Sequence, residues 1–160
     1  MALCIGRISG ISNCTSALHL VLRAIGIKPG DEVITVPNSF VASAAAISLA
    51  GGTPVFVDIC HCGNMDPQQL EDAITQRTRA VIPVHLTGRP AEMQAILDIA
   101  RRRDLFVLED AAQAVGAELN GKRVGSWGDA ACFSMHPLKN LHAFGDAGMV
   151  TSNDEVLIAR

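Results

Sequence analysis

Long runs of one charge sign and long apolar runs are both missing from this sequence. The formal net charge is −3, without the clustered basic residues by which nucleic-acid-binding proteins hold phosphates. No apolar stretch reaches the roughly 18 residues needed to cross a bilayer. The opening MALCIGRISG is too short for the basic, apolar and cleavage regions of a signal peptide. These absences argue against nucleic acid and membranes as partners, and we expect a cytoplasmic protein.

The cysteines offer neither an even disulfide set nor a repeated metal-binding pair. There are five of them, at positions Cys4, Cys14, Cys60, Cys62 and Cys132. An odd number spread through apolar segments is typical of reduced thiols, which is what we expect here. The CHC stretch at Cys60–Cys62 could indicate a metal, but its spacing is short and no second pair accompanies it, so we expect none.

Linkers, low-complexity tracts and exact repeats are absent as well, so the sequence indicates one domain. Its 160 residues are 49% hydrophobic and 18% charged, which is enough to bury a core and argues against disorder. No G-x-G-x-x-G or Walker-type loop follows an apolar run, which weakens the case for a generic nucleotide-binding domain. The chain starts almost at its first expected helix and stops inside the one expected after Asn153, so we expect a piece of a longer protein.

Six short apolar runs carry the strand signal. They are nearly continuous rather than alternating, which is typical of strands covered on both faces in a parallel sheet. The runs are Glu32–Val36, Pro54–Ile59, Ala80–Leu86, Leu105–Asp110, Ala130–Ser134 and Gly148–Ser152.

Helical patterns separate these runs. Asp66, Pro67 and Gln69 supply the cap, first turn and third position of one helix. Further helices are expected at Ala17–Ile27, in FVASAAAISLAGG (40–52) and in AEMQAILDIARRR (91–103). Alternation of strands and helices at this pace predicts an α/β fold, a three-layer α/β/α sandwich with a mostly parallel sheet.

Polar and aromatic side chains follow the ends of these strands, where ligands bind in open parallel sheets. They are Phe40 after the first run, His85 in the third, Glu109 and Asp110 ending the fourth with Gln113 beyond, and Ser134, His136 and Lys139 at and after the fifth. In addition, SNCTSAL (Ser12–Leu18) opens a helix with small polar residues. The free N–H groups of such a helix start suit a phosphate, although an ordinary N-cap explains the pattern too.

This collection matches the needs of pyridoxal phosphate (PLP) chemistry. The aldehyde needs a lysine amine, and the pyridine nitrogen needs a carboxylate that keeps it protonated, so that the ring can act as an electron sink. The phosphate needs donors, and the ring needs a flat neighbour. A phosphate site, an aromatic ring, a carboxylate, a hydroxyl and a lysine are all expected at one edge of the sheet.

Four longer stretches closely resemble the DegT/DnrJ/StrS family of sugar aminotransferases, which have fold type I of the aspartate aminotransferase superfamily. They are GDEVITVPNSFVASAAAISLAGGTPVFVDI, AVIPVHLTGRPAEM, VLEDAAQAVGAELNGKRVGSWGDAACFS and HPLKNLHAFGDAGMV. The likeness runs from about Ser9 to Asp154, and EDAAQA combined with a strand-Phe-Ser-x4-Lys segment is its most specific part. It implies that residues 1–160 are the PLP-binding large domain, truncated at both ends and without the small C-terminal domain.

The resemblance also implies roles for seven residues. Lys139 resembles the lysine that forms a Schiff base with the cofactor, and Asp110 resembles the carboxylate paired with the pyridine nitrogen. The implied cofactor contacts are completed by Gln113 near the cofactor hydroxyl, Ser134, Thr15 and Ser16 at the phosphate, and Phe40 stacked on the ring. Lys139 and Asp110 are thus the implied catalytic residues.

Each of these residues has a simpler interpretation that the residue type alone leaves open. A lysine in a loop is usually a solvated charge. Phe40 could belong to the core, and Asp110 could cap the helix that follows it. Ordinary strand-end, surface or cap positions would explain Ser134, Gln113 and Thr15.

Three further polar residues near the strand ends are not assigned to the site. His85 and His136 are more often satisfied structural histidines than catalytic ones. Glu109 precedes Asp110 on a strand, so its side chain should point to the opposite face of the sheet.

The sequence departs from the family pattern where Cys14 and Ala147 stand in place of frequent glycines. We expect Cys14 to be tolerated. The methyl group of Ala147 could strain a tight turn in the GDAG stretch after Lys139.

The resemblance implies a PLP-dependent aminotransferase that acts on a nucleotide-linked keto-sugar, with glutamate as the amino donor. It also implies a homodimer with a shared active site. Some relatives dehydrate sugars instead, often with histidine in place of the Schiff-base lysine, and Lys139 weighs against that outcome. A catalytically silent piece or a regulatory module on the same fold stays open.

Overall fold

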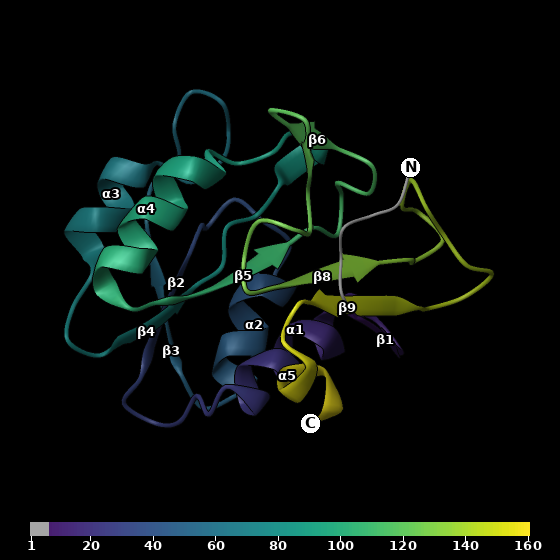
Figure 1. Ribbon diagram of the computed structural model, residues 1–160, viewed down its shortest axis with the longest axis horizontal. Coiled ribbons are helices and arrows are strands. Elements are labelled where there is room, and N and C mark those ends of the chain that lie inside the picture. Colours follow the sequence, from purple (N-terminus) through teal and green to yellow (C-terminus); the bar gives the residue numbers. More distant parts are fainter. Residues whose placement is uncertain (1–6) are drawn as a thin grey trace.

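The computed structural model describes residues 7–160, and a central sheet of seven strands organises them (Figure 1). The strand order across the sheet is β1-β9-β8-β5-β4-β2-β3. These strands are β1 (Arg7–Ile11), β2 (Glu32–Thr35), β3 (Thr53–Phe56), β4 (Thr78–Val81), β5 (Phe106–Asp110), β8 (Ala130–Ser134) and β9 (Gly148–Ser152). A separate antiparallel ribbon pairs β6 (Glu118–Leu119) with β7 (Lys122–Arg123).

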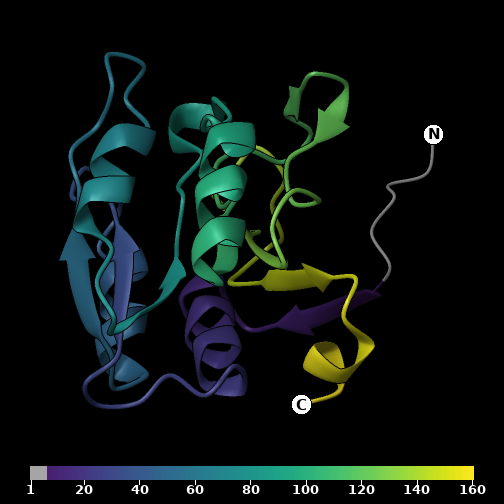
Figure 2. The ribbon, with the colours of Figure 1, turned by 60° about the vertical axis from the view of Figure 1, so that its left-hand side comes forward.

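Helices cover both faces of the sheet. One face carries α1 (Cys14–Ala24), α2 (Ala42–Leu49) and α5 (Glu155–Ala159), and the other carries α3 (Pro67–Ala73) and α4 (Met93–Arg103) (Figures 1 and 2). A short 3-10 turn at Leu86–Gly88 follows β4. The predicted α/β fold with three layers is therefore confirmed.

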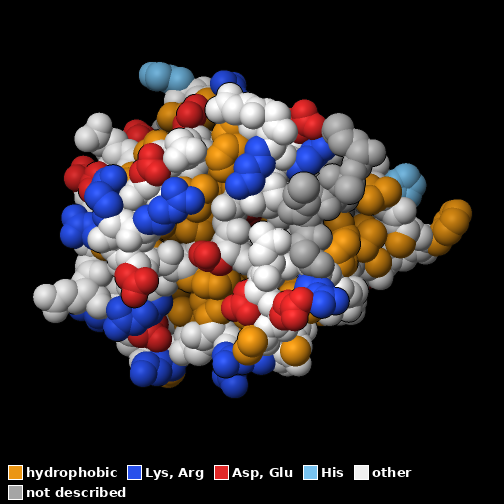
Figure 3. Space-filling model, viewed as in Figure 1, with side chains coloured by type: hydrophobic (Ala, Val, Ile, Leu, Met, Phe, Trp, Pro, Cys, Tyr) orange, Lys and Arg blue, Asp and Glu red, His pale blue; other side chains and the backbone are white. Residues whose placement is uncertain are grey.

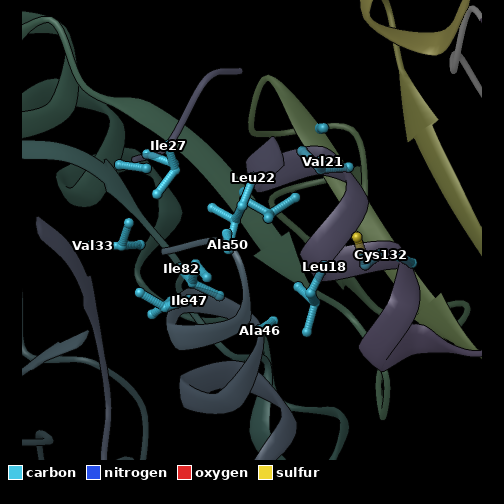
Figure 4. Close-up of a cluster of buried hydrophobic side chains, with 14 of the residues drawn as sticks. Leu18, Val21, Leu22, Ile27, Val33, Ala46, Ile47, Ala50, Ile82 and Cys132 are labelled. Carbon is cyan, nitrogen blue, oxygen red and sulfur yellow. The ribbon is translucent and has the colours of Figure 1, made fainter. Parts of the chain in front are cut away.

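Alternation along the strands explains why the apolar runs are continuous. On β2, Val33 packs into the core beneath α1 and α2, whereas its neighbour Ile34 packs into the core beneath α3 and α4. Figure 4 shows the first core, in which Leu18 and Leu22 of α1 meet Ile47 of α2 over the sheet. A strand buried on both faces needs apolar side chains at every position.

Most of the sheet is parallel, as predicted. β3, β2, β4, β5 and β8 run in one direction, whereas β9 is antiparallel to β8 and β1 is antiparallel to β9. The predictions contain no strand at β1, whose RISGI sequence is largely exposed and gives a weak apolar signal. β3 is an edge strand with no buried residue, so the expectation that every run is covered on both faces is wrong for β3.

Local chemistry sets the element boundaries. α1 begins at Cys14, within the SNCTSAL stretch that was predicted to open a helix and three residues before the predicted apolar pattern starts at Ala17. The Asn13 side chain caps it by accepting from the Ser16 N–H at 2.8 Å. β4 ends at Val81 rather than at the predicted Leu86, two residues before Pro83, which has no N–H to donate to a ladder.

The cysteines divide into a bonded pair and a free pair. Cys60 and Cys62 form a disulfide, so the prediction of reduced thiols is wrong for them. A tight turn with Gly63 at φ +86° brings the chain back on itself here, and the Gly63 N–H donates to the Cys60 carbonyl at 2.9 Å. Cys14 and Cys132 are free and buried, as predicted. Cys4 and the start of MALCIGRISG lie outside the described residues.

Within residues 7–160, the longest helices have 11 residues, and no helix is both long and apolar enough to traverse a bilayer.

Candidate active site

A cavity of ≈ 560 Å³ opens at the carboxyl ends of β5 and β8, beside the start of α1. The structure brings all seven residues of the sequence-based site to its wall: Thr15, Ser16, Phe40, Asp110, Gln113, Ser134 and Lys139. Four separate chain segments supply them. This volume lies within the range of roughly 300 to 1,000 Å³ that is typical of small-molecule and cofactor sites.

The first turn of α1 forms one end of the cavity. Thr15 and Ser16 line it with half-buried hydroxyl side chains, and the N–H groups of a first helical turn have no intrahelical acceptors. Gly148 at the start of β9 permits the close approach of this turn, since a Cβ there would lie 2.7 Å from the Asn13 carbonyl carbon. With the buried Ser134 hydroxyl also at the wall, these donors and the helix dipole can hold a phosphate.

Asp110 ends β5 and lies at the cavity wall with only 5% of its surface exposed. Its Oδ2 accepts a hydrogen bond from the Ser43 hydroxyl at 2.7 Å, and its Oδ1 accepts from the Ala112 N–H at 3.2 Å. Burial raises the pKa of the Asp110 carboxyl, and these two hydrogen bonds oppose that rise by stabilising the anion. The carboxylate is therefore fixed in orientation, and the two bonds offset part of the cost of burying its charge.

Lys139 reaches the cavity from the loop after β8. It is half-buried, and its backbone N–H donates to the His136 carbonyl at 2.9 Å, which forms a turn. In the part of the chain that the structure describes, no carboxylate oxygen lies within 4.0 Å of the Lys139 ammonium. A lysine at a cavity wall without a structural ion pair is available for covalent or proton-transfer chemistry.

Phe40, in the loop after β2, and Gln113, in the loop after β5, both line the cavity. Phe40 is 70% exposed, so its interpretation as a core side chain is wrong. An aromatic ring left at a cavity wall offers a flat face to a planar ligand. The Gln113 Oε1 accepts from the Thr87 N–H at 2.8 Å, which leaves the side-chain NH₂ group to donate.

Glu109 lies on the opposite face of the sheet, as predicted, and does not reach the cavity. Its side chain is fully buried and binds the loop before β8. The donors to its two oxygens are the N–H groups of Gly125, Trp127 and Gly128, at 2.7–2.8 Å. Glu109 therefore organises this loop.

His85 completes the Glu109 cluster. Its Nε2 lies 3.0 Å from Glu109 Oε2, and its Nδ1 accepts from the Ala91 N–H at 3.0 Å. Because Nδ1 accepts, the proton is on Nε2, and both ring nitrogens are satisfied. His85 is thus a satisfied structural histidine, whereas His136 lies at the cavity wall.

Ser43, Ser39 and Asn13 belong to the site although the sequence did not single them out individually. Ser39 and Asn13 line the cavity, and Ser43 holds Asp110 from α2. The helical spacing places the Ser43 hydroxyl on the same buried face of α2 as Ala46 and Ile47, and a polar group on an apolar face indicates a buried hydrogen-bond partner. The sequence does not reveal the partner of this hydroxyl, because Asp110 lies 67 residues away in the chain.

The two departures from the family pattern are accommodated. The left-handed backbone region contains only Thr87, Asp104 and Asn120 among the described non-glycine residues. Ala147 is not one of them, so the expected strain at this position is wrong. Cys14 is buried at the start of α1, and burial raises the pKa of its thiol.

Comparisons with known proteins point to one family. The model of the DegT/DnrJ/EryC1/StrS aminotransferase family matches residues 7–160. The chain is 53% identical over 149 residues to the pleiotropic regulatory protein of Geobacillus stearothermophilus, and this alignment covers 92% of this chain and 40% of that protein. It is 51% identical over 149 residues to the UDP-N-acetyl-3-dehydro-alpha-D-glucosamine 3-aminotransferase of Acidithiobacillus ferrooxidans, with the same coverage of 92% and 40%.

A solved structure agrees in fold. NtdA from Bacillus subtilis, crystallised with the bound cofactor PMP, superposes with a TM-score of 0.93 at 38% identity. The match covers 98% of this chain and 35% of that one. The chain thus spans about 40% of the length of the curated relatives it matches.

Proposed function

The chain belongs to the DegT/DnrJ/EryC1/StrS aminotransferase family, and from this premise we propose that the protein is a PLP-dependent aminotransferase. It transfers an amino group from glutamate to a nucleotide-linked keto-sugar in amino-sugar biosynthesis. The observation that carries the proposal is the single cavity that gathers Lys139, Asp110 and the first turn of α1. Residues 1–160 would be its PLP-binding large domain.

The side chains around the cavity fit PLP in their chemistry. The α1 hydroxyls of Thr15 and Ser16, with Ser134, would hold the phosphate, and Phe40 would cover the ring. Gln113 would donate to the ring hydroxyl through its free NH₂ group. When bound, the cofactor supplies the electron sink that amino transfer requires.

Asp110 would act on the pyridine nitrogen. A buried carboxylate fixed by Ser43 and Ala112 presents a charge that keeps a proton on a neighbouring ring nitrogen. A neutral side chain of the same shape could not stabilise that positive charge.

Lys139 would carry the covalent and proton-transfer work. Its amine would hold the cofactor aldehyde and, once released by the incoming amino donor, would remove and return a proton at the reacting carbon. Its lack of a carboxylate within ion-pair distance, among residues 7–160, leaves the amine available for both tasks.

The substrate class is supported by a relative. The Acidithiobacillus ferrooxidans protein at 51% identity is named as an aminotransferase for a UDP-linked dehydro-glucosamine. A nucleotide-linked keto-sugar is the acceptor that this similarity favours for the present protein.

The decisive experiment is to trap the cofactor on its lysine. The protein is mixed with PLP, reduced with borohydride and digested, and mass spectrometry should find a single pyridoxyl group on the peptide with Lys139. Lys139→Ala should abolish the label, and Lys28→Ala, at the amino-terminal edge of the sheet, should retain it. A labelled Lys139→Ala protein would refute the assignment.

Product analysis then defines the reaction. With glutamate and a nucleotide keto-sugar, 2-oxoglutarate and an amino-sugar should form together. A dehydrated sugar without 2-oxoglutarate would indicate the dehydratase reaction of some relatives instead.

A regulatory module is the second candidate, since the relative at 53% identity is named a pleiotropic regulatory protein. This alternative predicts a protein that binds no PLP or that binds it without producing 2-oxoglutarate from glutamate.

The proposed assembly is a cytoplasmic homodimer with shared active sites. Exposed apolar side chains lie on the loop between β8 and β9, and Figure 3 shows hydrophobic side chains at this end of the molecule. The residues are Leu138, Leu141 and Phe144, of which Leu138 also lines the cavity. Such a patch supports burial against a second subunit. Light scattering should give twice the chain mass, and a monomeric mass at all concentrations would contradict the dimer.

A further inference from the structure

We infer that Ser43 is a positioning residue for Asp110, and that its hydroxyl fixes the orientation and the anionic state of this carboxylate. The functional consequence rests on the function proposed above, because it concerns the pyridine nitrogen of the cofactor. The geometric part rests on the protein alone.

The hydrogen bonds around Ser43 have one consistent direction. Its Oγ lies 2.7 Å from Asp110 Oδ2, 3.0 Å from the Ser39 Oγ and 3.5 Å from the Phe40 carbonyl oxygen, which is the longest of the three contacts. An ionised carboxylate only accepts, and a serine has a single hydroxyl proton, so Ser43 donates to Asp110 and accepts from Ser39. The result is a short relay from the loop after β2 through α2 to the end of β5.

Because this chain of hydrogen bonds is buried, water cannot easily take the place of the Ser43 hydroxyl. Ser43 is only 1% exposed, and it sits in the stripe of α2 that faces the sheet. Water therefore has little access with which to replace its hydroxyl if that group is removed. At 3.2 Å, the bond from Ala112 to Oδ1 is longer, which leaves Ser43 as the donor of the shorter and stronger bond.

The remaining groups near Asp110 do not replace Ser43. Lys139 favours the anion electrostatically, but it contributes less than the Ser43 hydrogen bond does, and His85 is a neutral ring bound to Glu109. Cys14 and Cys132 also face the carboxylate, and burial raises the pKa of both thiols, so they stay neutral and supply no positive charge. Loss of the Ser43 hydroxyl should therefore favour a protonated Asp110, which cannot stabilise a protonated pyridine nitrogen.

The first test uses the cofactor-free protein. The side-chain carboxyl carbon of Asp110 is followed by ¹³C NMR as the pH is varied, in wild type and in Ser43→Ala. Removal of a hydrogen bond to a charged group should raise the proton affinity of Asp110 about tenfold. Ser43→Thr keeps the hydroxyl and should restore the wild-type titration.

Ser48→Ala is the matched control, because Ser48 is exposed on the same helix and its hydroxyl approaches only the Ala44 carbonyl. It should leave the Asp110 titration unchanged. An unchanged titration in Ser43→Ala, or a Ser43→Thr protein that behaves like Ser43→Ala, would overturn the inference.

The second test uses the PLP-loaded protein. Ser43→Ala should lower kcat for glutamate about tenfold and leave KM unchanged, because the carboxylate acts on charge that develops during reaction. The visible absorbance of the bound cofactor should depend on pH differently in Ser43→Ala than in wild type. If wild type binds no PLP, the proposed function fails, whereas the NMR titration still decides the role of Ser43.

Discussion

Two adjacent carboxylates at the end of β5, Glu109 and Asp110, lie in different environments. Glu109 is fully buried on one face of the sheet and receives three backbone N–H groups and His85. Asp110 is 5% exposed on the other face, receives two donors and lies at the cavity wall. The first is saturated by the protein and serves the fold, whereas the second keeps capacity for a ligand.

The difference arises from what packs against each face. On the Glu109 side, a loop folds back over the strand ends and points its N–H groups inward. On the Asp110 side, the first turns of α1 and α2 line a cavity and do not close over the carboxylate. Strand alternation separates the two carboxylates, and the neighbouring elements give them their roles.

Asp110→Asn should break the functional side of this comparison with the largest effect. Asparagine keeps the shape but cannot hold a proton on a pyridine nitrogen by charge, so amino transfer should fall about 10³-fold. The free energy of unfolding should change by less than about 1 kcal/mol, because the amide oxygen can accept from the Ala112 N–H while the Ser43 hydroxyl turns to accept from the amide NH₂ group. Steady-state kinetics and urea unfolding measure the two quantities, and near-normal activity would contradict the role of Asp110.

Glu109→Gln should break the structural side. The amide places an NH₂ group against buried donors, so the free energy of unfolding should fall by about 3 kcal/mol. PLP should still be trapped on Lys139 in the molecules that remain folded. A variant with unchanged stability that had lost PLP binding would show that Glu109 belongs to the site.

The pH dependence of stability sharpens the comparison with a smaller effect. Burial raises the pKa of Asp110 in the folded state, so the folded protein holds this proton more tightly than the unfolded chain does. Relative to Asp110→Asn, wild-type stability should therefore fall as the pH rises above the ordinary aspartate value of about 3.9.

Glu32 supplies a contrasting control, because its pKa is lowered by hydrogen bonds from Thr75 and Arg77. Relative to Glu32→Gln, wild-type stability should be lost as the pH falls below about 4.3. Urea unfolding at a series of pH values measures how the free energy of unfolding changes with pH in each pair of proteins. The two differences should change with pH in opposite directions, and a change in the same direction would contradict the stated pKa shifts of Asp110 and Glu32.

Much of the fold was predictable because its signals are local. Continuous apolar runs gave β8 and β9 with their observed bounds, and the cap at Asp66 gave α3. The site residues were predictable as a set because strand ends meet at one edge of a parallel sheet. β1 was not predictable, since its pairing with β9 joins segments about 140 residues apart through backbone hydrogen bonds.

The sequence by itself determined the layers of this protein and the motif that resembles the aminotransferases, including Lys139 in the loop that follows a strand. Only the tertiary structure decided the hydrogen-bond partners, such as Ser43, which reaches Asp110 from 67 residues away. It also decided that Phe40 stays exposed at the cavity and that Cys60 and Cys62 are bonded. Periodicity and capping depend on neighbours in the chain, whereas a partner across the fold depends on how whole elements pack.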